Sequence, residues 1–183
     1  MGKLAQGVVI AIAMLVSTTA FGQSNAPMPA QTASAPGQFT DQDRAFVDKA
    51  AIRGMFEVQA GHLAAKSSDS QVRDFASRMV QDHSAAGDEL KRIVDAKGIS
   101  LPDALDDKHQ QLLTKLGALD GAAFDREYVQ EMVDDHDEDA RAFAEAGRTL
   151  NDPELKAFAE KMLTVIQSHD RMAHEIAGKM AEK

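Results

Sequence analysis

The chain of 183 residues has no cysteine, no tryptophan and a single tyrosine. Without cysteine, disulfide bonds, thiol catalysis and a lipid on an N-terminal cysteine are all excluded. Signals for β-strands are also scarce, because Val, Ile and Thr never alternate over a sustained run and no Asn-Gly hairpin pair occurs. Stability must therefore come from an apolar helical core, or from that core together with a bound metal.

Basic stripes and the common enzyme motifs are missing as well. The net charge is −9, and no Lys- and Arg-rich stretch with interleaved aromatic residues occurs, so we expect no nucleic-acid partner. The sequence contains no Gly-rich phosphate loop, no Gly-x-Ser-x-Gly elbow and no His-Glu-x-x-His motif. It therefore leaves open whether the protein is an enzyme and favours a role without catalysis.

The N-terminus has the pattern of an export signal. Lys3 precedes an apolar run over residues 4–17, and Ala20-Phe21-Gly22 forms a small-x-small cleavage site. A membrane anchor is the alternative, but the run is shorter than the ~20 residues that span a bilayer. We predict a cleaved signal peptide over residues 1–22 and a flexible linker rich in Pro, Ala and Ser over residues 23–40. The mature protein is then expected to be periplasmic or secreted, with no transmembrane span.

The rest of the chain, residues 41–183, is predicted to be one all-α domain. Its apolar spacing, capping residues and breaks indicate helices over residues 41–66, 69–98, 106–119, 121–148 and 153–183. Residues 72–79 resemble residues 155–162, which suggests two similar helical hairpins. The segment between them is too long for a tight turn. We therefore predict a ferritin-like four-helix bundle of two antiparallel hairpins joined by a lengthwise crossover that contains a short helix, in preference to an up-down-up-down bundle.

Each of the four long helices carries one metal-capable residue on its apolar face. His83 illustrates the pattern, because it lies four residues after Met79 and three before Ala86. Counting from the turns places all four at a similar depth along the bundle. The four residues are Glu57, His83, His136 and His169.

A buried, unpaired Glu57 would cost several kcal/mol, so a metal ion or a protonated histidine must accompany it. Three imidazoles and one carboxylate suit zinc, copper, nickel or iron better than calcium or magnesium. Three neighbouring carboxylates are candidates for orienting or charge-balancing the ligands, namely Asp82, Asp135 and Asp170. The alternative is a buried Glu–His polar network that only specifies packing. The other histidines, His62, His109 and His174, are expected at the surface.

These residues carry a resemblance to a known family. The chain resembles domain of unknown function 4142, a group of exported bacterial ferritin-like proteins often labelled outer membrane proteins, over about residues 45–174. The matching features are residues 46–57, residues 75–83, Leu101-Pro102, residues 121–125 with Tyr128 and His136, and Phe158-Ala159 with His169. The resemblance implies a ferritin-like four-helix bundle and brings no established activity. The residues three before the histidines are Val80, Val133 and Ile166, so the Glu-x-x-His pattern of di-iron proteins is absent.

Three functions follow, in order of preference. The first is an exported bundle that binds one transition metal in metal handling or envelope stress tolerance. The second is a non-catalytic structural or interaction protein of the bacterial envelope with a buried Glu–His network. The third is a metal-dependent redox enzyme, in which Tyr128, two turns before His136, would lie near the metal. The oligomeric state is left open.

Overall fold

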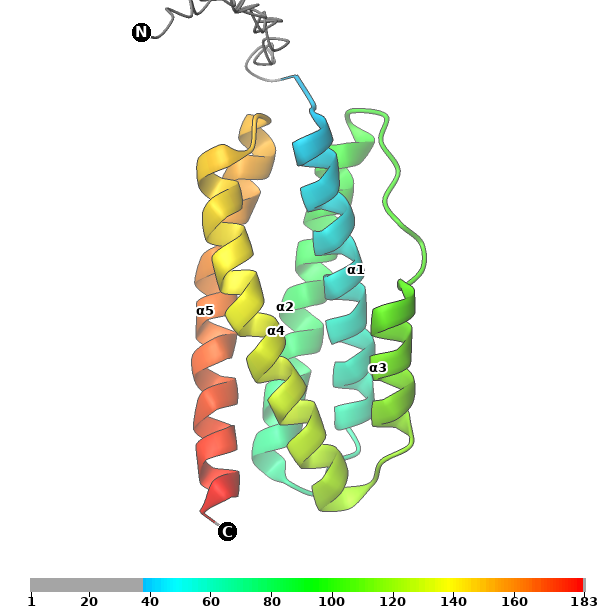
Figure 1. The fold of residues 1–183 in the computed structure, drawn as a ribbon, viewed down its shortest axis with the longest axis vertical. Coiled ribbons are helices and arrows are strands. Elements are labelled where there is room, and N and C mark those ends of the chain that lie inside the picture. Colours follow the sequence, from blue (N-terminus) through cyan, green and yellow to red (C-terminus); the bar gives the residue numbers. More distant parts are fainter. Residues whose placement is uncertain (1–37, 183) are drawn as a thin grey trace, which may run out of the picture. The chain divides into compact units, whose positions relative to one another are not determined.

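The computed structural model describes residues 38–182, and it is all-helical over that range, as predicted (Figure 1). Its helices are α1 (Asp41–Ala64), α2 (Ser70–Asp95), α3 (Asp107–Gly117), α4 (Gly121–Thr149) and α5 (Pro153–Ala181). The predicted signal peptide and nearly all of the predicted linker lie outside the described residues. Within the described range, no helix is both long and apolar enough to cross a membrane.

Side-chain caps set the starts of four helices close to the predicted positions. Thr40 and Asp43 form a reciprocal capping box at the start of α1. Asp69 caps α2, Asp106 caps α3, and Asp152 caps α5 directly before Pro153. Each of these side chains accepts hydrogen bonds from backbone N–H groups that have no partner inside the helix. The start of each of these helices is therefore encoded locally.

Two antiparallel helix pairs form most of the domain. A short turn joins α1 to α2, another joins α4 to α5, and the two pairs pack through α2 with α5 and through α1 with α4. After α2, the chain turns at Gly98, whose φ of 70° favours glycine. It then runs alongside α1 to α3, which packs against α1 (Figure 1).

The core residues of α1 differ in part from the stripe that apolar spacing in the sequence predicts for this helix, which is Phe46, Ala50, Gly54, Gly61 and Ala64. Gly61 and Ala64 are buried as expected, but Phe46, Ala50 and Gly54 are only partly buried. The buried positions closer to the N-terminus are instead Val47, Ala51, Phe56 and Ala60. The reason is that α1 contacts α2, α3 and α4, so more than one of its faces is apolar and spacing alone does not select the innermost one.

The same packing corrects the prediction for His109. We expected this histidine at the surface, yet it is 5% exposed because α3 packs on α1. Its ring lies 5.4 Å from the ring of Phe56, and its Nδ1 donates to Asp106 Oδ1 at 2.6 Å. His62 and His174 are exposed, as predicted.

Candidate metal centre

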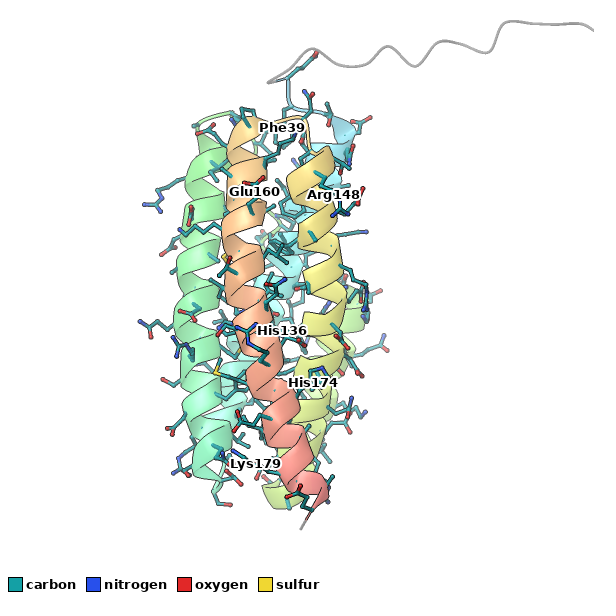
Figure 2. All side chains as sticks on the ribbon, turned by 90° about the vertical axis from the view of Figure 1, so that its left-hand side faces the viewer. Phe39, His136, Arg148, Glu160, His174 and Lys179 are labelled. Atoms are coloured by element: carbon teal, nitrogen blue, oxygen red, sulfur yellow. The ribbon has the colours of Figure 1, made fainter. Side chains whose placement is uncertain are left out.

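A polar layer divides the bundle core into two apolar clusters. One cluster includes Phe75, Met79 and Met132, and the other includes Leu90 and Ile166. Between them lie four buried polar side chains, one from each long helix. Their exposed fractions are 1% for Glu57, 5% for His83, 0% for His136 and 0% for His169. The structure therefore brings the four sequence-predicted residues to one level of the interior, where Figure 2 labels His136 between the ends of the bundle.

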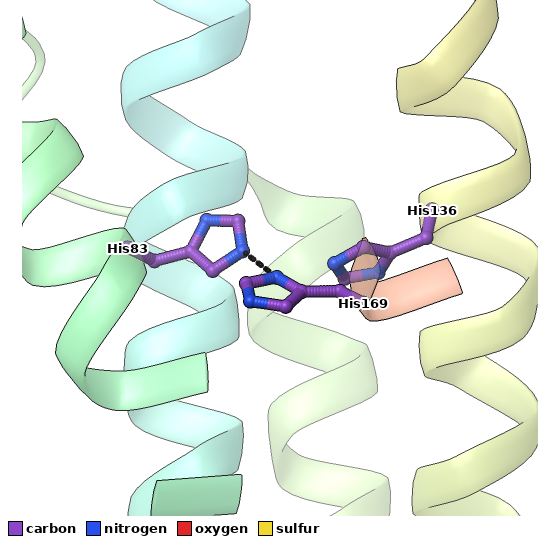
Figure 3. Close-up of side chains that lie close together, drawn as sticks. All are labelled: His83, His136 and His169. Carbon is purple, nitrogen blue, oxygen red and sulfur yellow. Dashed lines mark hydrogen bonds between the residues drawn. The ribbon is translucent and has the colours of Figure 1, made fainter. Parts of the chain in front are cut away.

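The three imidazoles converge on one point from α2, α4 and α5 (Figure 3). The ring centroids are 5.2 Å apart for His83 and His169, 5.5 Å for His136 and His169, and 5.6 Å for His83 and His136. One nitrogen from each ring lies within 4.8 Å of the other two. The closest pair is His83 Nε2 and His169 Nδ1, at 3.2 Å.

The opposite nitrogen of each ring faces an oxygen acceptor. His83 Nδ1 lies 2.7 Å from Glu57 Oε2, and His169 Nε2 lies 2.8 Å from Asp82 Oδ2. His136 Nδ1 lies 2.9 Å from the carbonyl oxygen of Met132. Because a carbonyl or carboxylate oxygen can only accept, each of these nitrogens carries the proton and donates. In the neutral rings, the three inward nitrogens therefore keep their lone pairs.

Burial and the charge of Glu57 shift the pKa values of the three imidazoles in different directions. Burial opposes a charged His83, but the adjacent Glu57 carboxylate outweighs burial and raises the pKa of His83. For His136, burial dominates and lowers the pKa to about 4. Burial also lowers the pKa of His169, partly opposed by its hydrogen bond to Asp82. Without a metal, one proton therefore belongs on His83, paired with Glu57, while the other two imidazoles are neutral.

The carboxylates predicted around the ligands occupy different environments. Asp82 contacts His169, whereas Asp170 lies 3.4 Å from the exposed His174 and does not contact the three imidazoles. Asp135 is 3% exposed, and no group among residues 38–182 donates to its Oδ2. Burial and the nearby Glu57 raise the pKa of Asp135 to about 7. Of these three aspartates, Asp82 is therefore the one that contacts and orients a ring.

Sequence reasoning missed a buried ion pair beside the polar layer. Arg53 on α1 pairs with Asp139 on α4 and with Glu138 at 2.5 Å. Asp139 is 3% exposed. It lies three residues after His136, so helical spacing alone could have assigned it to the same inward face. Arg53 supplies positive charge to a region that already holds Glu57, Asp135 and Asp139.

Tyr128 has no polar partner among the described residues. Its side chain is fully buried, its ring stacks on Phe124, and its hydroxyl makes no hydrogen bond within residues 38–182. Burial, reinforced by the negative charge of Glu57, raises its pKa. The hydroxyl is therefore protonated at neutral pH.

Comparison with known proteins agrees with the helical fold. The family model described as Domain of unknown function (DUF4142) matches residues 28–176. A crystal structure of a DUF305 protein from Streptomyces coelicolor, named as a putative secreted protein, superimposes with a TM-score of 0.63 at 17% sequence identity. The alignment covers 74% of this chain and 91% of that chain. No curated protein matches the chain.

Proposed function

The chain belongs to the family Domain of unknown function (DUF4142), and we propose that its helical domain binds one divalent transition-metal ion through His83, His136 and His169. The observation that carries the proposal is the direction of the six ring nitrogens. Three face oxygen acceptors, and the other three face one another, so that each offers a lone pair once all three rings are neutral. Metal-binding histidines commonly have this arrangement, in which an outer acceptor fixes the tautomer and orients the ring.

The spacing of the inward ring nitrogens is consistent with an ion of the size of zinc. Two nitrogens at 2.0–2.1 Å from a tetrahedral zinc ion are roughly 3.3–3.4 Å apart. The separation of 3.2 Å between His83 and His169 is close to that value. The inward nitrogen of His136 lies within 4.8 Å of the other two. Imidazole ligands favour zinc, copper, nickel or iron over calcium and magnesium.

Glu57 would stabilise the ion by charge and by orienting His83. Its Oε2 accepts from His83 Nδ1, while its Oε1 accepts from no group among residues 38–182 and lies 3.7 Å from His136 Nε2. The free oxygen makes Glu57 the candidate for a fourth ligand, as the sequence also suggested. Its negative charge offsets one of the two positive charges of the ion in a core where charge is costly.

The proposed setting is the bacterial envelope. The N-terminal sequence pattern supports export, and the structural neighbour from Streptomyces coelicolor is named as a secreted protein. The two helix pairs and the connection that runs along α1 support a ferritin-like bundle with a lengthwise crossover. An exported domain with one such centre would serve in metal handling or stress tolerance.

A second candidate is a structural envelope protein without a metal. It is favoured by the short contact of 2.7 Å between His83 and Glu57, which forms a buried ion pair once His83 is protonated. A proton on His83 Nε2 can also be donated to His169 Nδ1 across 3.2 Å. In this case the polar layer would fix how the helices pack, and no ion would be needed.

Metal analysis separates the two candidates. Protein without a His tag is stripped with a chelator, incubated with Zn²⁺ or Co²⁺, and freed of unbound ion before its metal content is measured. We expect about one ion per chain, and a Co²⁺ absorption spectrum typical of tetrahedral coordination. His136→Gln should lose the ion, because it removes one inward nitrogen without touching the Glu57–His83 pair.

His62→Gln is the matched control, since His62 is exposed on α1 and should leave the metal content unchanged. Equal, substoichiometric metal in the wild type and in His136→Gln would exclude the metal centre. The same result, with a melting temperature unaffected by the chelator, would favour the structural role.

A further inference from the structure

A cavity of about 330 Å³ leads from the surface between α1 and α2 to the polar layer. Its walls are mostly apolar and include Leu90, Phe143 and Phe158, and the segment after α2 contributes Leu101 and Pro102. The inner end is formed by polar groups, namely Glu57, His83, Arg53 and Asp139. An apolar passage with a few polar groups at one end is typical of a small-molecule site.

Of the described residues that line the cavity, the one with an unpartnered buried side-chain polar atom is Glu57, whose Oε1 is an acceptor, while the lining residues Gln59, Ser84 and Lys91 are exposed. Arg53 is engaged by Asp139 and Glu138, and His83 Nδ1 is engaged by Glu57. The free group at this end is therefore the carboxylate oxygen Glu57 Oε1, in a chain of net charge −9. A bound molecule should therefore donate a hydrogen bond at this end, and an anionic head group would be repelled.

Two glycines that the packing does not require lie along the cavity. Gly54 on α1 and Gly87 on α2 both line it, and both lie in helix interiors, where glycine is less stable than alanine. A Cβ atom added at either position would meet no heavy atom within 4 Å. Close helix packing therefore does not explain these residues. Both positions leave open space beside the cavity, which a larger side chain would occupy.

We infer that this cavity binds a small amphiphilic molecule with an apolar body and a neutral or cationic head that donates a hydrogen bond, such as an alcohol, a phenol or an amine. A dry cavity of 150 Å³ holds benzene, so about 330 Å³ suits a body of roughly ten or more non-hydrogen atoms. The apolar body would lie against Phe143 and Phe158, with the head toward Glu57. Binding does not require the proposed metal ion.

Fluorescence titration with 2-naphthol tests the inference. The chain has no tryptophan and one tyrosine, so the emission of the probe can be followed with little background. We expect saturable binding of one molecule per chain by the chelator-treated protein. 2-Naphthoate has a similar body but a carboxylate head, and should bind at least ten-fold more weakly.

Substitutions locate the probe. Gly54→Leu and Gly87→Leu each place a side chain in the opening and should weaken 2-naphthol binding at least ten-fold. Gly178→Leu is the matched control, because Gly178 also lies in a helix with open space around it but does not line the cavity. It should bind 2-naphthol like the wild type. Circular dichroism melting checks that all three variants fold.

The proposed small-molecule site and the proposed metal centre can be refuted independently of each other. His136 does not line the cavity, so His136→Gln should lose Zn²⁺ but keep 2-naphthol binding, whereas Gly87→Leu should keep Zn²⁺ and lose 2-naphthol. Three results would each overturn the inference: no saturable binding to the wild type, 2-naphthoate binding as tightly as 2-naphthol, or unchanged binding in both folded cavity variants.

Discussion

Replacing Glu57 by glutamine in the metal-free protein is the most direct test of the polar layer. The substitution keeps the shape of the side chain and removes its charge. Glu57 is 1% exposed, and its Oε2 lies 2.7 Å from His83 Nδ1. The amide oxygen of glutamine can still accept from His83, so the experiment isolates the ion pair rather than the hydrogen bond.

The expected cost is a large fraction of the stability of a domain. Removing one member of a buried ion pair costs about 3–5 kcal/mol. Because glutamine retains an acceptor, we expect a value near the lower end, about 3 kcal/mol. With a urea m-value of roughly 2 kcal/mol/M for a domain of this size, the unfolding midpoint should fall by about 1.5 M.

The pH dependence identifies the source of this loss. Glu57 raises the pKa of His83 in the folded state above its ordinary value. The resulting stability is fully present below about pH 6.5, the ordinary pKa of histidine, and is lost as the pH rises through the raised folded pKa. The difference in the free energy of unfolding between wild type and Glu57→Gln should therefore be largest near pH 6 and become smaller at alkaline pH.

Urea unfolding monitored by circular dichroism, with chelator present and at several pH values, measures this difference. Glu145→Gln is the matched control, because Glu145 is 59% exposed in its pair with Arg148 and should cost less than about 1 kcal/mol. A loss below 1 kcal/mol for Glu57→Gln at pH 6, or a loss independent of pH, would refute the proposed buried ion pair.

Three further predictions address other parts of the structure. Asp82→Ala removes the acceptor of His169 Nε2 and should weaken Zn²⁺ binding by about 10–100-fold in a competition titration. Asp135→Asn removes a carboxyl whose folded pKa is about 7. Because this raised pKa destabilises the wild type as the pH rises from 4 to 7, the free energy of unfolding of the variant relative to wild type should increase by up to about 4 kcal/mol over that range, measured by urea unfolding. Gly61→Ala should destabilise by about 1–3 kcal/mol in thermal melts, because its Cβ would lie 2.7 Å from Val80 Cγ2.

Each of these predictions has a control in the same element. Asp88→Ala changes an exposed aspartate of α2 and should leave Zn²⁺ affinity unchanged. Asp134→Asn, at the exposed neighbour of Asp135, should show no comparable pH-dependent gain. Gly54→Ala should stabilise α1 by about 0.5–1 kcal/mol, since nothing lies within 4 Å of the added atom. If Gly54→Ala and Gly61→Ala had equal effects, the close approach of α1 and α2 at Gly61 would be wrong.

The sequence by itself determined the helices and the residues that face inward on three of them. Capping is local, so the helix starts predicted near residues 41, 106 and 153 agree with the observed caps Thr40, Asp106 and Asp152 to within a residue or two. Apolar spacing placed His83, His136 and His169 on buried faces, because a helix with one apolar stripe has only one way to face the core. The same spacing located Glu57 correctly while misplacing part of the α1 stripe around it.

Tertiary structure decided what spacing cannot encode. Which nitrogen of each imidazole faces inward depends on an acceptor, and the acceptors of His83 and His169 come from another helix. Whether Asp82 or Asp170 reaches a ring depends on side-chain rotamers and on how α2 and α5 meet. The burial of His109 and the cavity beside Gly54 likewise arise only where helices pack together. Periodicity along one helix gives a direction, whereas a site requires the distances between several helices.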